Sequence, residues 1–149
     1  MPERKGLGRV LAPAMALMVA GGFAFAKDAK GAMSSAELKS LLTGNSLAGN
    51  GKDKIPAEPY DWVAFYGADG VLEMRLKPAW GGKRFVGRWW LTNDGQFCRN
   101  FGKTKKQEGC WRMYREPRSL RFVPTRGKAV EGNAIMLSGN QVAQMEAKK

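Results

Sequence analysis

The residues of this chain with the clearest chemical potential are arginines and lysines interleaved with aromatic side chains. Between positions 84 and 121, ten basic residues stand against three acidic ones, so this segment carries a net charge of +7. Guanidinium groups beside aromatic rings suit carboxylate and phosphate binding and ring stacking. We therefore predict a basic, aromatic-rich face for an anionic partner. Its candidate contacts are Arg88, Arg99, Lys103, Lys105, Lys106, Arg112 and Arg115.

The same pattern has two other interpretations. In the first, the aromatic side chains fill a core while the arginines line the solvent-exposed face of the same strands. In the second, tryptophans line the mouth of an open barrel that carries a small apolar ligand. The candidate pocket residues are then Trp89, Trp90 and Trp111.

Groups able to catalyse a reaction or bind a metal are sparse. The sequence contains no histidine, which removes the commonest general base and the commonest metal ligand. Asp69 and Asp94 would be the carboxylate pair of a glycosidase-like site, but each precedes a glycine, and Asp-Gly is typical of turns. We predict a non-enzymatic protein with no catalytic, cofactor or metal site.

The basic segment is expected to fold as a three-stranded antiparallel meander. The Asn-Asp-Gly sequence at positions 93–95 is a hairpin signal between two aromatic-rich runs, and a third run follows a lysine-rich connection. Cys98 and Cys110 are the only cysteines, and a short loop would place them opposite each other on neighbouring strands, so we predict a disulfide. A two-residue turn pairs Cys98 with Leu91 and a three-residue turn pairs it with Trp90. The sequence therefore leaves open which face of the sheet is buried.

The remaining sequence predicts one small, mainly β domain over residues 27–140. A capping box at Ser34 to Glu37 begins a short helix over about residues 34–43. Residues 45–59 are expected to form a loop, with a short extended piece at 46–48 as the alternative. About seven short strands then follow over residues 60–137, joined by turns, which indicates an antiparallel meander that forms a small barrel or half-barrel. A loose polar tail is expected at residues 141–149.

Residues 1–26 are typical of a secretory signal peptide. Basic residues at positions 4, 5 and 9 precede an apolar run, and Ala-Phe-Ala at 24–26 suits signal peptidase, so cleavage is expected before Lys27. The alternative is an uncleaved anchor, for which the apolar run is short. This segment contributes +2 of the total charge of +12, which leaves +10 on the mature chain. Export predicts a periplasmic or secreted protein with an oxidised cysteine pair.

Several short motifs resemble those of small exported proteobacterial proteins classed as domains of unknown function. They are Gly-Asn-Ser at 44–46, Phe-Tyr-x-x-Asp-Gly at 65–70, Gly-Arg-Trp at 87–89, and the two cysteine-containing runs, the second of which includes Cys-Trp at 110–111. The resemblance covers nearly the whole mature chain. It implies export, a disulfide and a compact β-rich fold, and it implies no catalytic residues.

For an exported protein of this charge, the expected partners are an anionic glycan, a lipid head group or an acidic protein, and nucleic acid is not expected. The leading hypothesis is a binding or accessory protein of the cell envelope. The alternatives are a periplasmic inhibitor of an acidic enzyme, since a basic enzyme would repel the chain, and a carrier of a small apolar ligand. The sequence does not identify the ligand or the oligomeric state.

Overall fold

The computed structural model describes residues 31–51 and 54–147. The expected signal peptide and its cleavage site lie outside the described residues. In the part of the chain that is described, neither helix has the length and apolar composition needed to cross a membrane.

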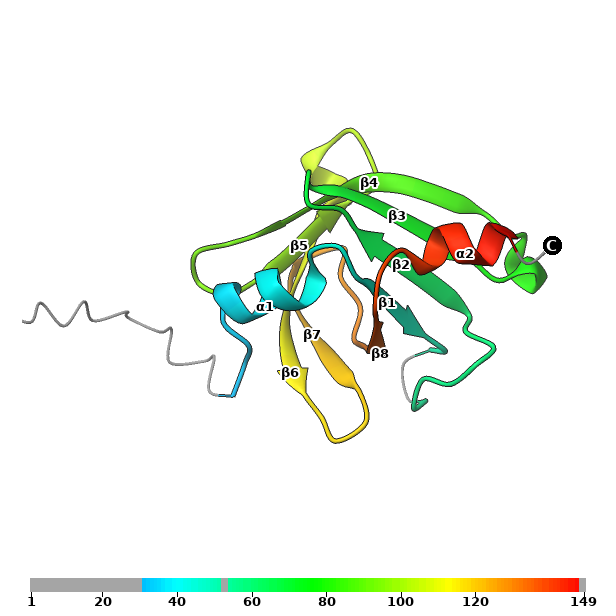
Figure 1. Ribbon diagram of the computed structural model, residues 1–149. Helices are drawn as coiled ribbons and strands as arrows, with labels where there is room; N and C mark the ends of the chain where they lie inside the picture. Colours follow the sequence, from blue (N-terminus) through cyan, green and yellow to red (C-terminus); the bar gives the residue numbers. More distant parts are fainter. Residues whose placement is uncertain (1–30, 52–53, 148–149) are drawn as a thin grey trace, which may run out of the picture.

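Eight antiparallel strands in these residues close into a barrel, and each strand pairs with its neighbours in sequence (Figure 1). β1 also pairs with β8, with Ser46 opposite Leu137, and this pairing closes the sheet. The predicted mainly β meander barrel with a short N-terminal helix is therefore confirmed. The strands are β1 (Ser46–Gly49), β2 (Trp62–Tyr66), β3 (Val71–Leu76), β4 (Arg84–Leu91), β5 (Phe97–Asn100), β6 (Gly109–Arg115), β7 (Leu120–Gly127) and β8 (Gly132–Leu137). The helical elements are α1 (Ser35–Leu42), η2 (Pro78–Trp80), η3 (Lys105–Gln107) and α2 (Gln141–Ala147).

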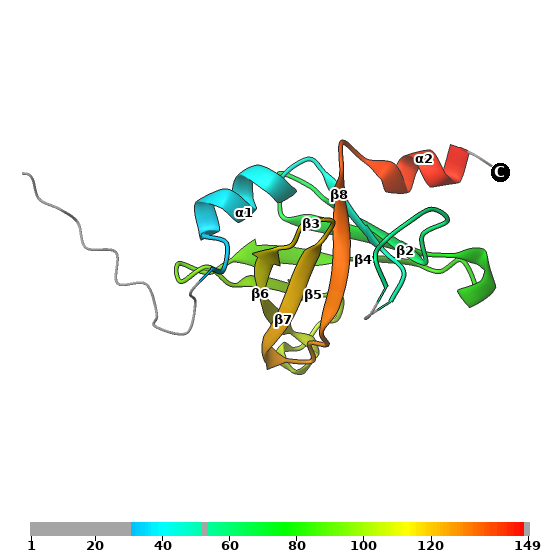
Figure 2. The same ribbon diagram turned by 90° about the horizontal axis from the view of Figure 1, so that it is seen from below.

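Two elements differ from the sequence prediction. β1 brings the strand number to eight where about seven were expected, and it coincides with the short extended piece suggested at residues 46–48. Its sequence, Ser-Leu-Ala-Gly, has no β-branched or aromatic residue, so its intrinsic preference for a strand is weak. Pairing with β2 and β8 and the burial of all four residues stabilise the strand instead. Residues 141–147 of the expected loose tail form α2 on the outside of the barrel (Figures 1 and 2). Val142 anchors α2 because its side chain is buried against Ala48 and Val63.

The turn between β4 and β5 determines which face of these strands is buried, a question that the sequence left open. Trp90 lies opposite Cys98, and Thr92 N–H donates to the Gln96 carbonyl at 2.9 Å, so the connecting loop has three residues. Gly95 ends this loop with φ of 84°, a left-handed conformation that favours glycine. Side chains alternate across a strand, so Trp89 points into the barrel and Cys98 points outward.

α1 covers one end of the barrel, which we call the capped end. The Ser34 hydroxyl accepts from Glu37 N–H at 3.2 Å, and the Glu37 carboxylate accepts from Ser34 N–H at 2.7 Å, which confirms the capping box. Leu38 and Leu42 are fully buried in the core, and the Ser35 hydroxyl donates to the Thr92 carbonyl. Figure 1 shows α1 beside the β4–β5 turn.

The opposite end of the barrel is the open end. Alternate connections of an antiparallel meander lie at the same end. The described connections at residues 50–51, 54–61, 77–83, 101–108 and 128–131 therefore lie at the open end, away from α1.

Candidate ligand-binding site

A cavity of about 370 Å³ lies inside the barrel toward the open end. Gly51, Val130 and Glu131, which belong to the open-end connections, line its mouth, while side chains of β2, β3, β5 and β6 form its walls. The volume falls within the range of about 300–1,000 Å³ that is typical of small-molecule sites. The wall residues that matter for its chemistry are Trp62, Tyr66, Met74, Phe97, Arg99 and Trp111.

The inner part of the cavity is built from aromatic rings that hold one another in place. Tyr66 packs edge-to-face against Trp89 and Phe97, with ring centroids 5.5 Å apart in both pairs. Phe97 stacks on Trp111 at 5.8 Å. The indole N–H groups are satisfied by the backbone, since Trp111 donates to the Val130 carbonyl at 2.8 Å and Trp89 donates to the carbonyl at position 67 at 2.9 Å. Apart from the Tyr66 hydroxyl, the surface offered to a ligand by these rings is therefore apolar and rigid.

Arg99 is the one charged side chain of the inner wall among the described residues. It belongs to β5 directly after Cys98, so the outward disulfide directs the Arg99 side chain inward. Its Cζ lies 4.8 Å from the Trp111 ring centroid and 5.2 Å from that of Phe101. Nη1 lies 3.9 Å from the Met74 sulfur. These are weak contacts for a guanidinium group that carries five N–H donors.

The Arg99 guanidinium has no acidic counterion in the described part of the chain, where no carboxylate lies within ion-pair distance. Every fully buried side-chain nitrogen and oxygen of the described residues has a hydrogen-bond partner. The Arg99 N–H groups that lack a protein partner are therefore not sealed in the wall. They retain accessible surface, and the space that they border is the cavity.

Burial shifts the pKa values of two titratable side chains of the inner cavity, Arg99 and Tyr66. It lowers the pKa of the Arg99 guanidinium, but an arginine stays protonated in proteins. Burial also raises the pKa of Tyr66 to about 12, against a smaller opposite effect of Arg99, so the phenol is neutral at physiological pH. Glu131 is exposed at the mouth. The inner cavity thus combines one positive charge with apolar walls, which suits a molecule with an apolar body and a carboxylate, phosphate or sulfate group.

The seven basic residues that the sequence nominated for an anionic partner do not lie on one face. Arg99 points into the cavity, whereas Arg88 is exposed on the outer face of β4. Lys103, Lys105 and Lys106 are exposed in the β5–β6 connection at the open end. Arg115 is exposed at the capped end, beside α1.

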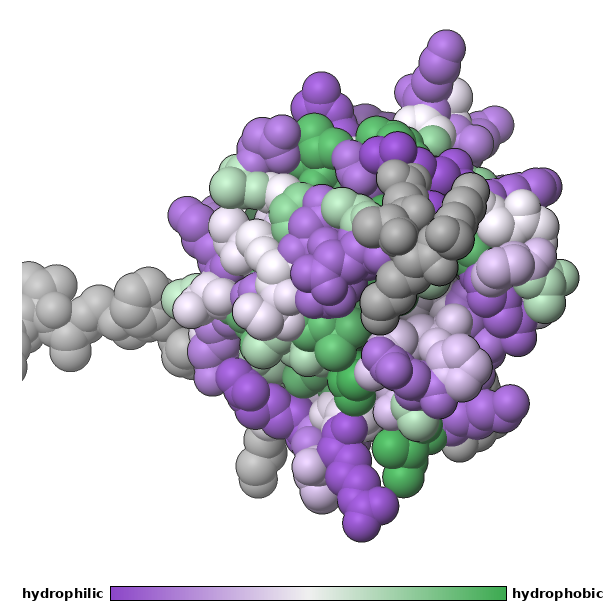
Figure 3. Space-filling view, turned by 45° about the vertical axis from the view of Figure 1, so that its right-hand side comes forward, coloured by the Kyte–Doolittle hydropathy of each residue, from purple (hydrophilic) through white to green (hydrophobic). Residues whose placement is uncertain are grey.

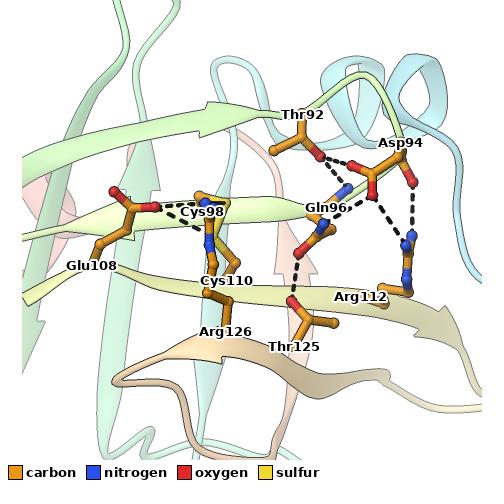
Figure 4. The surroundings of a disulfide bond; sticks show 9 residues. All are labelled: Thr92, Asp94, Gln96, Cys98, Glu108, Cys110, Arg112, Thr125 and Arg126. Carbon is orange, nitrogen blue, oxygen red and sulfur yellow. Dashed lines mark hydrogen bonds and ion pairs between the residues drawn. A yellow bond between two sulfur atoms is a disulfide. The ribbon is translucent and has the colours of Figure 1, made fainter. Parts of the chain in front are cut away.

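Arg112, the last of the seven, is mostly buried on the outer face of β6. Its Nη1 donates to the Asp94 carbonyl at 2.7 Å, and Nη2 lies 3.3 Å from the Asp94 carboxylate (Figure 4). The same carboxylate accepts from Gln96 at 2.9 Å and from the Thr92 hydroxyl. Arg112 therefore fastens the β4–β5 turn to the barrel wall.

The predicted disulfide between Cys98 and Cys110 is confirmed, with an S–S distance of 2.07 Å and a Cα–Cα distance of 4.1 Å. It joins β5 to β6 on the outer face, where Arg126 covers it (Figure 4). Arg126 Nη2 lies 3.2 Å from the Cys110 sulfur and 2.6 Å from the Glu108 carboxylate. Although Glu108 and both sulfurs lie within 4.8 Å of one another, the sulfurs are bonded together and are not thiolate ligands for a metal.

Of the three tryptophans nominated for a pocket, only Trp111 lines the cavity. Trp89 is buried in the core, and Trp90 lies on the outer face opposite Cys98. The sequence analysis missed Trp62 and Tyr66 as cavity residues. Their alternation along β2 was a usable signal, since side chains two residues apart share a face.

Comparisons of this chain with protein-family models, with curated proteins and with solved structures find no match.

Proposed function

We propose that this protein is a non-enzymatic, exported ligand-binding barrel, and that it holds a small molecule with an apolar body and one anionic group. The N-terminal pattern of the sequence supports export. The closed barrel with one capped end supports a ligand held in the lumen.

The single observation that carries the proposal is Arg99, a guanidinium group inside the cavity without an acidic counterion in the described residues. Arg99 is partly buried, and a charge removed from most of its water without a partner is unfavourable for folding. An anionic ligand group would remove that cost and accept hydrogen bonds from the free N–H groups. Such charge-assisted bonds are short and about twice as strong as neutral ones.

The side chains of the cavity wall indicate the chemistry of the uncharged part of the ligand. Trp62, Phe97 and Trp111 present ring surface to the cavity, which favours an aromatic or branched aliphatic body. The volume of about 370 Å³ excludes a long polymer from the lumen. An aromatic or short-chain carboxylate, phosphate or sulfate ester therefore fits better than a wholly apolar compound.

The test compares two fluorescent probes that differ only in charge. 8-Anilino-1-naphthalenesulfonate carries a sulfonate, and N-phenyl-1-naphthylamine is its uncharged parent. The native protein should bind the sulfonate more tightly. Arg99→Met keeps an apolar side chain of similar length and should weaken sulfonate binding by about 10- to 100-fold, the range expected for a hydrogen-bonded charge, while N-phenyl-1-naphthylamine binds as before.

Arg88→Met is the matched control, because Arg88 lies on the outer face one strand away. It should leave both affinities unchanged. Circular dichroism of each variant excludes partial unfolding, which would raise sulfonate fluorescence for another reason. The proposal fails if Arg99→Met and Arg88→Met bind the sulfonate equally well, or if the native protein does not prefer the sulfonate to its parent.

A further inference from the structure

The open end of the barrel exposes apolar side chains on three of its four connections. Ile55 is 60% exposed, Trp80 is 49% exposed and Val130 is 76% exposed. Figure 3, which brings the right-hand side of Figure 1 forward, shows hydrophobic residues at the surface between hydrophilic ones. Single exposed apolar residues are common on protein surfaces. These three belong to separate connections at the same end of the barrel, and Val130 also lines the mouth of the cavity, so they are not scattered in this way.

The charge of the chain is divided unequally between the two ends of the barrel. The described open-end connections, residues 50–51, 54–61, 77–83, 101–108 and 128–131, carry seven lysines and four acidic residues. The capped end, comprising α1, Arg115 and residues 67–70, 92–96 and 116–119, carries three basic and four acidic residues. The open end therefore has an excess of positive charge, and the capped end has an excess of negative charge.

Two acidic side chains of the open end form ion pairs within the protein. Asp61 lies 2.7 Å from Lys77 Nζ, and Glu108 lies 2.6 Å from Arg126. In contrast, Lys103, Lys105 and Lys106 are exposed together in and beside the 3-10 turn η3. The surface that a partner meets at this end is therefore cationic between apolar tips.

We propose that the open end docks on an anionic phospholipid bilayer, with Ile55, Trp80 and Val130 inserted at the interface and the surrounding lysines on the head groups. Peripheral membrane binding needs both contributions, an apolar area that enters the interface and a basic patch. Trp80 is suited to the interface because its ring has an apolar body and a polar edge. An acidic protein would satisfy the lysines but would leave these three protruding side chains without a role.

This orientation would also place the cavity mouth against the bilayer. A molecule with an apolar body and an anionic group partitions into the head-group region, so docking and ligand exchange would occur at the same place. The docking proposal does not depend on the cavity's ligand. Arg99→Met, which tests the cavity, should bind membranes like the native protein because Arg99 lies inside the barrel.

The test is co-sedimentation with vesicles of phosphatidylcholine, with or without phosphatidylglycerol. The native protein should bind the mixed vesicles and not pure phosphatidylcholine. Replacing Ile55, Trp80 and Val130 by Ser should weaken binding by at least about tenfold, since insertion scales with buried apolar area. Lys105→Gln with Lys106→Gln should weaken it by about 25-fold, from a factor of about five for each lysine near an anionic surface.

The matched control variants change exposed residues on the outside of the barrel and at its capped end. Val86→Ser with Met136→Ser removes two exposed apolar side chains, and Lys39→Gln with Arg118→Gln removes two exposed charges. Both double variants should bind the mixed vesicles within about twofold of the native protein. Equal weakening by either control would overturn the proposal because binding would not be specific to the open end. Undiminished binding by the Ser triple variant would also overturn it, because charge alone would then account for the binding.

Discussion

Arg99 lies over the indole ring of Trp111 inside the barrel, with its Cζ 4.8 Å from the ring centroid. Among the described residues, Arg99 carries the only charge of the inner wall, and the Trp111 ring is one of the largest apolar surfaces of that wall. Arginine is among the residues least often buried without an ion pair. A barrel built for stability alone would place an apolar side chain at this position.

Replacement of Arg99 should therefore stabilise the empty barrel. Arg99→Met removes a partly desolvated charge that has no ion-pair partner in the described residues, and it keeps a flexible side chain that can pack on Trp111. The free energy of unfolding should rise by about 1 kcal/mol, a size common for substitutions at functional sites. Urea denaturation without ligand measures the change, with Arg88→Met as the control that should have no effect. A loss of stability would indicate that Arg99 supports the fold and is not held there for a ligand.

The disulfide should contribute substantially to stability. Cys98 and Cys110 are separated by 12 positions in the sequence, and closing a loop of this size contributes about 3 kcal/mol in the chain-entropy estimate. Replacing both cysteines by Ser should lower the free energy of unfolding by about 2–4 kcal/mol. Chemical denaturation of the native and double-variant proteins makes the comparison. Equal midpoints would show that the bond does not constrain the chain.

Leu38 should be essential for the capped end. It is fully buried where α1 meets the barrel core, so Leu38→Ala leaves a cavity and should destabilise the protein by about 2–5 kcal/mol. Lys39→Ala on the exposed side of the same helix should change stability by less than about 0.5 kcal/mol. Thermal unfolding of the two variants separates them. Similar melting temperatures would mean that α1 is not needed to close the barrel.

Acid should weaken the β4–β5 turn. Hydrogen bonds from Thr92 and Gln96 lower the pKa of the Asp94 carboxyl group in the folded chain. The resulting stabilisation is present above the unfolded pKa, about 4, and is lost as the pH falls through the lower folded value. The free energy of unfolding should therefore decrease as the pH is lowered below about 4. Asp94→Asn should make this decrease smaller, and an identical pH profile for the variant would contradict the role of Asp94.

The sequence predicts the barrel and the disulfide because both rest on local patterns. The turn at 93–95, the alternation of Leu72, Met74 and Leu76, and the spacing of the cysteines each restrict the fold. β1 was harder to predict, since its strand conformation depends on β2 and β8, which are distant in sequence. α2 depends in the same way on contacts of Val142 with the outside of the barrel.

The sequence could not predict the cavity with the same success. A one-residue difference in the turn exchanges the two faces of β4 and β5, so the direction of Arg99 and Trp90 was undetermined. An arginine between a cysteine and an asparagine has the pattern of a solvent-facing residue. Only the observed pairing of Trp90 with Cys98 places Arg99 inside. Similarly, Arg112 has the sequence environment of a binding residue, yet it holds the Asp94 turn.

The central claim is that Arg99 binds the anionic group of a ligand within the barrel, and a crystal structure of the protein with 8-anilino-1-naphthalenesulfonate tests it most directly. The account predicts a sulfonate oxygen about 2.8 Å from the Arg99 guanidinium, the length of a charge-assisted hydrogen bond. It also predicts that the naphthalene ring lies against Trp111 and Phe97. A probe bound only on the outer surface, or one whose sulfonate points from the cavity to solvent, would contradict the account.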